Sequence, residues 1–359
     1  MTHILKKHPP SLNIKAGYIA KKLIQKEGLN AAQVDIVPGA AGGPKGLGIQ
    51  GLDQAIFGDF FSQAKQRRTL IGSSIGSWRF ASILAWGAKE GTERLADLYT
   101  NLSFHKKMTR HDVGDVCRNM LENLVKGKEQ QLINHPDYHL TILSIKANHI
   151  FQSDKTLPLL ASVMGIVGSN ALARKHNRLF MQRVISQPNI EQQFKVNDEF
   201  TTLYQSLTEK NVMPWLMASA SIPVAMSAVT DIPDAPKGSY RDGGLIDYHI
   251  DLPFESKGIV LYPHFTDHIT PGWFDKMLKN RRANPMNQAR TLLISPSQEY
   301  LQSLPLGHFP DRKDFTTKGL DQNERIKLWK QCIAESHRMG DEFLEMVEKQ
   351  NFADVIKSF

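Results

Sequence analysis

The stretch 68–86 limits the possible folds of this chain more than any other part of the sequence. Thr69-Leu70-Ile71 is typical of the end of a buried strand, and Ser77–Trp86 is mostly apolar without Gly or Pro, which predicts a buried helix. Gly72-Ser73-Ser74-Ile75-Gly76 lies between them and fits the G-x-S-x-G motif. A strand that turns directly into a helix brings the backbone on both sides of the turn together, so a Cβ at either glycine would clash. The context predicts a nucleophile elbow with a strained backbone at Ser74.

Ser74 would stand at the amino-terminal end of the following helix, whose dipole favours a developing oxyanion. The serine is therefore the candidate nucleophile. The alternative is a Gly/Ser loop without chemistry, because short motifs of this kind recur by chance. The choice between a catalytic elbow and an inert loop depends on whether the rest of the sequence contains a base and an oxyanion hole.

The composition is that of a globular protein. Of 359 residues, 41% are hydrophobic and 22% are charged, and the chain is long enough for one large α/β domain or two smaller ones. The 44 basic and 36 acidic residues give a net charge of +8. This balance favours an anionic partner, such as a membrane surface or nucleic acid, and it is equally compatible with a soluble protein that is simply basic.

Cys117 and Cys332 are the only cysteines and lack metal-ligand spacing, so a disulfide framework is not expected and a reducing compartment is natural. Met1–Lys26 carries several lysines but no continuous apolar run, so it does not resemble a secretory signal. We therefore expect a cytoplasmic protein that can lie peripherally on a membrane. Nucleic acid is not the partner we expect.

Strands and helices alternate in the first part of the chain. An amphipathic helix is expected at Ala16–Glu27, and Val34-Asp35-Ile36-Val37 predicts a short buried strand. A glycine-rich loop, Pro38–Gly46, then leads into a helix expected at 47–61, and the strand and helix of the elbow follow. This order favours an α/β layered fold with a mostly parallel sheet.

The later segments continue the pattern. Buried strands are expected at 140–145, 258–262 and 291–294, and a helical region at 323–355 is interrupted only by Gly340. No shift in composition marks a linker, and no internal repeat is present. We therefore expect a single domain over 1–359.

The glycine-rich loop does not fit a nucleotide site. A Walker loop needs Gly before its Lys and Ser or Thr after it, whereas this chain has Pro44-Lys45-Gly46. Gly46–Gly51 fits G-x-G-x-x-G, but no acidic residue lies between Asp59 and Glu90, where the dinucleotide fingerprint needs one. The remaining use is a cradle of backbone N–H groups, as an oxyanion hole requires.

Metal chemistry also has little support in the sequence. The histidine pairs His135/His139 and His264/His268 have i,i+4 spacing, but neither belongs to an H-E-x-x-H motif. We interpret them as surface or structural histidines. No metal and no other cofactor is expected.

Three pieces in this order resemble the patatin-like phospholipase family: the glycine loop with its basic residue, the G-x-S-x-G motif, and Asp242-Gly243-Gly244. The resemblance implies a three-layer α/β/α fold with a catalytic core at about 30–265, followed by a strand and helices at about 290–358. It implies a Ser74–Asp242 dyad, with Gly243 in the turn of the Asp loop. The oxyanion hole would lie on Gly42, Gly43, Lys45 and Gly46.

The implied activity is hydrolysis of lipid esters, of the phospholipase A or lysophospholipase type. From the residues alone, an Asp close to a serine hydroxyl can accept its proton, and partial burial would raise the pKa of that Asp. The alternative for Asp242 is an Asp-Gly turn partnered by Arg241. Ala41, Pro44 and Trp78 depart from the usual family pattern and affect the expected shape of the acyl pocket.

Two other functions stay open at this point. An α/β-hydrolase-type esterase would use a triad of Ser74, Asp242 and one of three histidines, His264, His268 or His308. Its elbow usually follows several strands, whereas here it comes early. The other possibility is a catalytically silent protein that binds a lipid surface.

The segment 156–183 is expected to cover the acyl pocket at a lipid interface. Thr156–Ala173 contains no charged residue, and Arg174, Lys175 and Arg178 follow it. An apolar stretch next to a basic one is typical of a helix that lies on an anionic membrane. The stretch is too short and too often interrupted to be a good membrane span, and a buried helix with a solvated end is the alternative.

Overall fold

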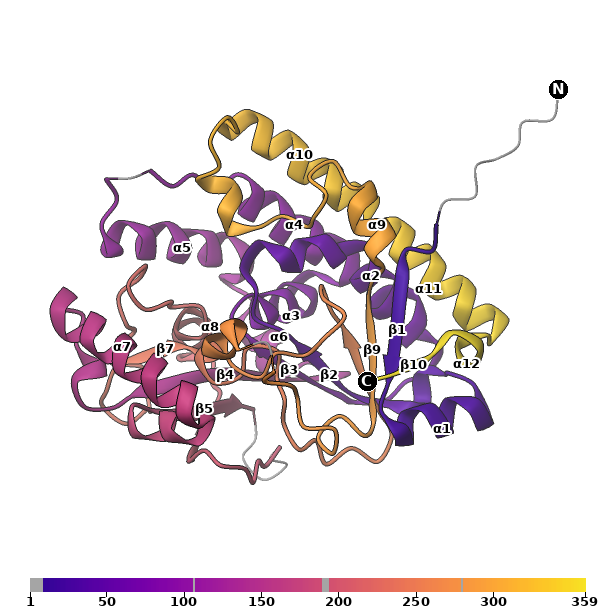
Figure 1. Ribbon diagram of the computed structural model, residues 1–359, viewed down its shortest axis with the longest axis horizontal. Coiled ribbons are helices and arrows are strands. Elements are labelled where there is room, and N and C mark those ends of the chain that lie inside the picture. The colour runs from indigo at the N-terminus through magenta and orange to yellow at the C-terminus, as the bar shows by residue number, and fades with distance from the viewer. Residues whose placement is uncertain (1–8, 106, 189–193, 279) are drawn as a thin grey trace.

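The computed structural model describes residues 9–105, 107–188, 194–278 and 280–359. Its centre is a ten-stranded sheet in the order β10-β1-β9-β8-β2-β3-β4-β5-β6, with β7 paired to β4 (Figure 1). The strands are β1 (Leu12–Ala16), β2 (Val34–Gly39), β3 (Arg68–Ser73), β4 (Tyr138–Ala147), β5 (Met181–Gln187), β6 (Thr202–Ser206), β7 (Tyr240–Asp242), β8 (Ile259–Pro263), β9 (Thr291–Pro296) and β10 (Lys357–Ser358).

The middle of the sheet is parallel. The strands β9, β8, β2, β3 and β4 pair in parallel, whereas β1 is antiparallel to β9 and β4 is antiparallel to both β5 and β7. The carboxyl ends of the parallel strands meet at one edge, where α/β folds place their sites. The predicted α/β class with a mostly parallel sheet is confirmed.

Twelve α-helices surround the sheet within the described residues. They are α1 (Tyr18–Glu27), α2 (Gln50–Gln54), α3 (Ile75–Trp86), α4 (Ala88–Thr100), α5 (Arg110–Val125), α6 (Glu129–Ile133), α7 (Thr156–Leu172), α8 (Val212–Ser219), α9 (Gln298–Ser303), α10 (Gln322–Glu335), α11 (His337–Lys349) and α12 (Phe352–Val355). In Figure 1, α4, α10 and α11 lie on one side of the sheet, and α7 stands at the opposite end of the molecule from α1 and α12.

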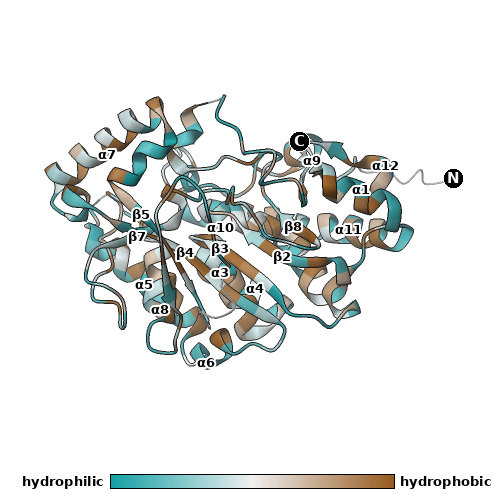
Figure 2. Cartoon of the chain, turned by 90° about the horizontal axis from the view of Figure 1, so that it is seen from below, coloured by the Kyte–Doolittle hydropathy of each residue, from teal (hydrophilic) through white to brown (hydrophobic). Residues whose placement is uncertain are grey.

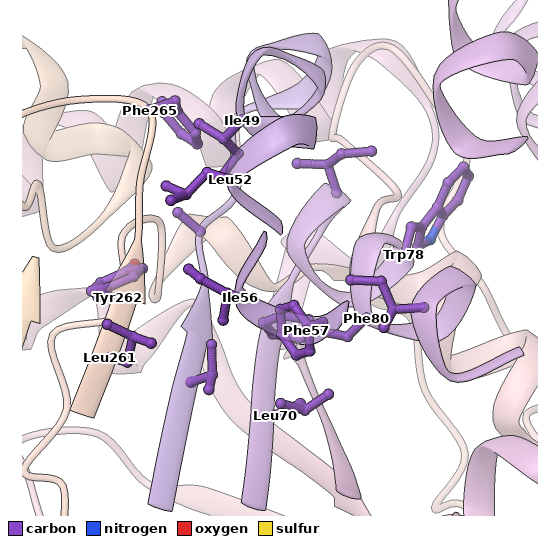
Figure 3. Packing of buried hydrophobic residues seen from close by; sticks show 14 of the residues in the cluster. Ile49, Leu52, Ile56, Phe57, Leu70, Trp78, Phe80, Leu261, Tyr262 and Phe265 are labelled. Carbon is purple, nitrogen blue, oxygen red and sulfur yellow. The ribbon is translucent and has the colours of Figure 1, made fainter. Parts of the chain in front are cut away.

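Both faces of the central strands are buried, because successive side chains of a strand point to opposite sides. Leu70 of β3 faces the helices and packs in one cluster with Phe80 of α3 (Figure 3). Its neighbour Ile71 belongs to a second cluster with Ile250 and Leu252, which come from an irregular segment. The arrangement is consistent with the expected three-layer α/β/α architecture, with an outer layer that is partly non-helical.

The region expected as one helix at 47–61 is irregular. It consists of the 3₁₀-helix η2 (Gly43–Ile49), α2, the π-helix η3 (Ala55–Phe60) and a short 3₁₀ turn. Its glycines allow close backbone contact: a Cβ on Gly51 would lie 2.4 Å from the carbonyl oxygen of Ser336, and one on Gly48 would lie 2.3 Å from the Phe309 ring. The G-x-G-x-x-G pattern therefore forms a packing surface against the C-terminal segment, at Phe309 and at the junction of α10 and α11.

Other boundaries also differ from the sequence predictions. The five strands expected at 34–37, 69–71, 140–145, 258–262 and 291–294 are confirmed, but β1, β5, β6, β7 and β10 were not predicted. The C-terminal helical region breaks between α10 and α11 at Ser336 rather than at Gly340. Ser336 Oγ accepts a hydrogen bond from the Gly51 amide at 2.8 Å, so the break serves the contact with α2.

Within the described part of the chain, no helix is both long enough and apolar enough to cross a membrane. The apolar stretch expected at 156–173 forms α7, and the following basic residues lie in the 3₁₀-helix η6 (Arg174–Leu179).

Candidate active site

The elbow forms as the sequence predicts, between β3 and α3. Ser74 has φ 54° and ψ −124°, a strained conformation for a residue with a Cβ. A Cβ on Gly72 would lie 2.5 Å from the backbone of Ser77, and one on Gly76 would lie 1.9 Å from the carbonyl oxygen of Gly39. Both glycines are therefore required for the close approach of β2, β3 and α3 that holds Ser74 at the edge of the sheet.

Asp242, at the end of β7, reaches the elbow. Ser74 Oγ donates a 2.9 Å hydrogen bond to Asp242 Oδ2, and the Gly244 amide donates one of 2.7 Å to Asp242 Oδ1. Gly243 permits this approach, because a Cβ there would lie 2.3 Å from the carbonyl oxygen of Leu143 on β4. The structure thus brings together the predicted nucleophile and the predicted base, which come from distant parts of the chain.

The Asp242 carboxyl group is buried, and its surroundings adjust its acidity. Burial raises its pKa to about 6, and the charge of Arg312 and the hydrogen bonds from Gly244 and Ser74 partly oppose this shift. The predicted upward direction is thus the one found. A carboxyl group with a pKa near 6 is ionised at neutral pH and is still a stronger base than an exposed aspartate, which suits proton transfer from a serine.

A second serine fixes the backbone of the elbow. Ser219, the last residue of α8, accepts a 2.9 Å hydrogen bond from the Ser74 amide and donates a 2.6 Å hydrogen bond to the carbonyl oxygen of Leu143. Ser77 Oγ donates to the carbonyl oxygen of Ser74 at 2.7 Å. This positioning role of Ser219 comes from the structure and was not predicted from the sequence.

The four residues predicted for the oxyanion hole do not all face the same cavity. Gly42 and Lys45 line one cavity with Ser74, and Gly43 lines another with Ser74. Gly46 faces α3 instead, where a Cβ would lie 3.2 Å from Arg79 Cδ. The Gly42 and Gly43 amides precede the hydrogen bonds of η2 and have no acceptor among the described residues. They are available as donors, as an oxyanion hole requires.

Ser74 lies in the walls of two cavities of different character. The first, of about 320 Å³, has a polar side formed by Lys45, Lys276, Asp311 and Arg312. The second, of about 290 Å³, is mainly apolar. Its wall includes Trp78, Tyr99, Leu102, Phe104, Val113, Met120, Met226 and Phe315. A reacting carbonyl at Ser74 could therefore place an apolar group on one side and a polar group on the other.

Arg312 is a site residue that the sequence did not reveal. It lines both cavities, and a Cβ on Gly43 would lie 2.7 Å from its Nε. Its neighbour Asp311 forms a 3.2 Å ion pair with Lys45. No local pattern distinguishes this arginine from the other basic residues, because its position depends on how the C-terminal segment packs.

The three histidines proposed for a triad have other partners. His264 is buried, its Nδ1 accepts a 2.9 Å hydrogen bond from the Thr266 amide, and burial lowers its pKa to about 3. His268 contacts Asp267, and His308 Nδ1 contacts the carbonyl oxygen of Phe309. Among the residues that the structure describes, no histidine is hydrogen-bonded to Ser74 or Asp242.

The described ranges contain no group of three or more His, Cys, Asp or Glu side chains that could hold a metal ion. Both carboxylate oxygens of Asp242 accept hydrogen bonds, one from Ser74 and one from Gly244, so no third side chain among the described residues is hydrogen-bonded to this carboxylate.

In comparisons with family models and with curated proteins, the sequence matches none of them.

Proposed function

We propose that this protein is a serine acyl hydrolase that acts on lipid esters through a Ser74–Asp242 dyad. The observation that carries the proposal is the 2.9 Å hydrogen bond from Ser74 Oγ to a buried carboxylate, at an elbow between two cavities. A serine hydroxyl is a weak nucleophile unless a base accepts its proton, and Asp242 is the base within reach. The resemblance to patatin-like phospholipases supports the same reaction class.

The reaction proceeds in two balanced halves. Ser74 Oγ bonds to the ester carbonyl carbon while its proton passes to Asp242 Oδ2, and the amides of the Gly42–Gly43 turn stabilise the resulting oxyanion. The intermediate collapses, and the alcohol leaves with the proton from Asp242. A water molecule then attacks the acyl-serine, Asp242 accepts its proton, and Ser74 recovers a proton as the acid departs.

The cavities indicate how a lipid ester would be placed. The acyl chain occupies the cavity lined by Trp78, Met120 and Phe315, since apolar surface drives its burial. The alcohol part faces Lys45 and Arg312 in the polar cavity, which suits a head group that carries negative charge. Phospholipid and lysophospholipid substrates have both features.

The direct test is acyl release from a panel of 4-nitrophenyl esters, phospholipids and lysophospholipids by the wild-type protein and by Ser74→Ala. We expect release by the wild type and none above background by the variant. A fluorophosphonate should add one adduct to the wild type and none to Ser74→Ala. His308→Ala is the matched control: its side chain contacts the Phe309 carbonyl, so kcat/KM should stay within about tenfold, below about 1.4 kcal/mol.

Two outcomes would contradict the proposal. Loss of activity in His308→Ala or His268→Ala as complete as in Ser74→Ala would favour a triad over the dyad. A folded wild-type protein with neither acyl release nor an adduct would favour a silent lipid-binding protein.

A further inference from the structure

The outward face of α7 is unusual for a surface helix. Its inner face is buried, with Leu159 and Ile166 in an apolar cluster, but its outer face also carries apolar side chains. Leu157 is 81% exposed, Met164 70% and Leu172 82%, and Leu160 lies on the same stripe. A helix in contact with water normally has polar residues on its outer side, so an apolar surface all round indicates a second apolar environment.

The apolar exposure continues onto η9 (Trp273–Met277). Trp273 is 40% exposed and Met277 is 75% exposed. Asp275 joins the two elements: it accepts hydrogen bonds from Asn170 on α7 at 2.8 Å and from the Gly272 amide at 2.9 Å. Phe274 also packs in the cluster that buries the inner side of α7. The two elements are therefore held together as one surface, which we call the α7–η9 face.

This face borders the opening of the polar cavity. Val163 of α7 and Trp273 of η9 line the same cavity as Ser74 and Asp242. An occupant of the α7–η9 face would therefore lie beside the entrance to the candidate active site.

Cations accompany the apolar face. Lys175 and Arg178 of η6 and Lys276 of η9 are exposed, and within the described ranges none of them forms an ion pair with a carboxylate. Arg174 differs from them, because it is bonded to Glu199 and to the carbonyl oxygen of Ile246. Of the three basic residues expected from the sequence beside the lipid interface, Arg174 is thus bonded to protein groups, whereas the side chains of Lys175 and Arg178 are exposed.

We propose that the α7–η9 face docks on an anionic lipid bilayer. Apolar side chains with adjacent unpaired cations match the acyl boundary and the negative head groups of such a surface. A second copy of this chain with its net charge of +8 would bring the same cations together, so charge favours the bilayer over self-association. Docking goes beyond the proposed hydrolysis, since it would bring the Ser74 cavity against the lipid.

The test is sedimentation with vesicles of phosphatidylcholine, with and without phosphatidylserine. We expect wild-type protein to bind the phosphatidylserine vesicles more tightly and to lose this preference at high salt. Leu157→Ser with Met164→Ser should weaken binding at least tenfold. Lys175→Gln and Arg178→Gln should each weaken binding to anionic vesicles about fivefold, the equivalent of about 1 kcal/mol. Because sedimentation measures binding alone, the outcome is independent of whether Ser74 hydrolyses an ester.

The matched control is Tyr18→Ser with Val355→Ser, which removes exposed side chains from α1 and α12 at the opposite end of the molecule (Figures 1 and 2). We expect this variant to bind as the wild type does. Equal binding by the control and the Leu157→Ser, Met164→Ser variant would overturn the proposal. So would a wild-type dimer, in analytical ultracentrifugation, that dissociates only when α7 is changed, because a second copy would then cover the face.

Discussion

Asp242, the last residue of β7, and Asp247, five residues later, are both buried, but their partners differ. Asp247 receives two hydrogen bonds from the guanidinium of Arg183, from Nε at 2.7 Å and from Nη2 at 2.9 Å. Asp242 faces a serine hydroxyl and a backbone amide and has no ion pair within the described residues. One carboxylate is neutralised by a fixed charge, and the other is left to exchange a proton.

The comparison separates a structural role from a chemical one. Burial alone would lower the pKa of Arg183, but Asp247 and Asp198 raise it, so the Arg183 guanidinium stays protonated. The pKa of Asp242 is raised to about 6 by burial, so its charge changes near neutral pH. Substitutions at the two positions should therefore have opposite effects on activity and stability.

The largest expected effect is on turnover by Asp242→Asn. Asparagine keeps the size of the side chain and can accept the Gly244 hydrogen bond, but it cannot accept the Ser74 proton. We expect kcat/KM to fall about 10²- to 10⁴-fold, the range for a lost general base. The assay is hydrolysis of the best ester found for the wild type, with circular dichroism as the check on folding. Retention of more than a tenth of the wild-type rate would remove Asp242 from the mechanism.

The second-largest expected effect is a loss of stability in Asp247→Asn. The variant leaves the Arg183 guanidinium buried with only Asp198 as a charged partner. Removal of one member of a buried ion pair costs about 3 kcal/mol or more in the free energy of unfolding. Urea unfolding measures this loss, while kcat/KM of the folded variant should stay within about tenfold of the wild type. An unchanged unfolding free energy would show that Asp247 is not the structural carboxylate.

A smaller effect of opposite sign is expected for the stability of Asp242→Asn. Because the pKa of Asp242 is higher in the folded state than its ordinary value of 3.8, the folded protein holds this proton more tightly. The native state therefore loses stability as the pH rises from about 4 to about 6, and the full cost is present above that window. Asn has no such cost, so the variant should be more stable at pH 8 by about 3 kcal/mol, and this gain should vanish below about pH 4. A gain in the free energy of unfolding that is the same at both pH values would contradict this explanation.

A second contrast, between residues placed by local sterics and residues placed by long-range packing, explains what could be predicted from the sequence. Ser74 stands in a motif whose glycines are required by local sterics, so its position follows from a few adjacent residues. The central strands have continuous apolar runs and are recognisable for the same reason. Strand β5 was missed because Arg183, buried through its ion pairs, interrupts the apolar pattern of that strand.

Residues placed by long-range packing could not be found in this way. Arg312 is the first residue of the 3₁₀-helix η10 (Arg312–Phe315), in which Asp314 accepts a hydrogen bond from Trp329 of α10 at 2.8 Å. The position of Arg312 beside Gly43 thus depends on how α10 lies against the rest of the molecule. The irregular helix at 43–60 has a similar cause, since Gly51 fits the backbone at the start of α11 and Gly48 fits the Phe309 ring, rather than a local helical preference.

The central claim is that Asp242 takes the proton from Ser74, and the pH dependence of serine labelling tests it most directly. The rate of fluorophosphonate addition to Ser74, followed by the mass of the intact protein, depends on the ionised fraction of the base. We predict a rate that rises with pH, shows an apparent pKa of about 6 and is level above it, and a slow rate without this inflection in Asp242→Asn. The same inflection in Asp242→Asn, at an undiminished rate, would contradict the account.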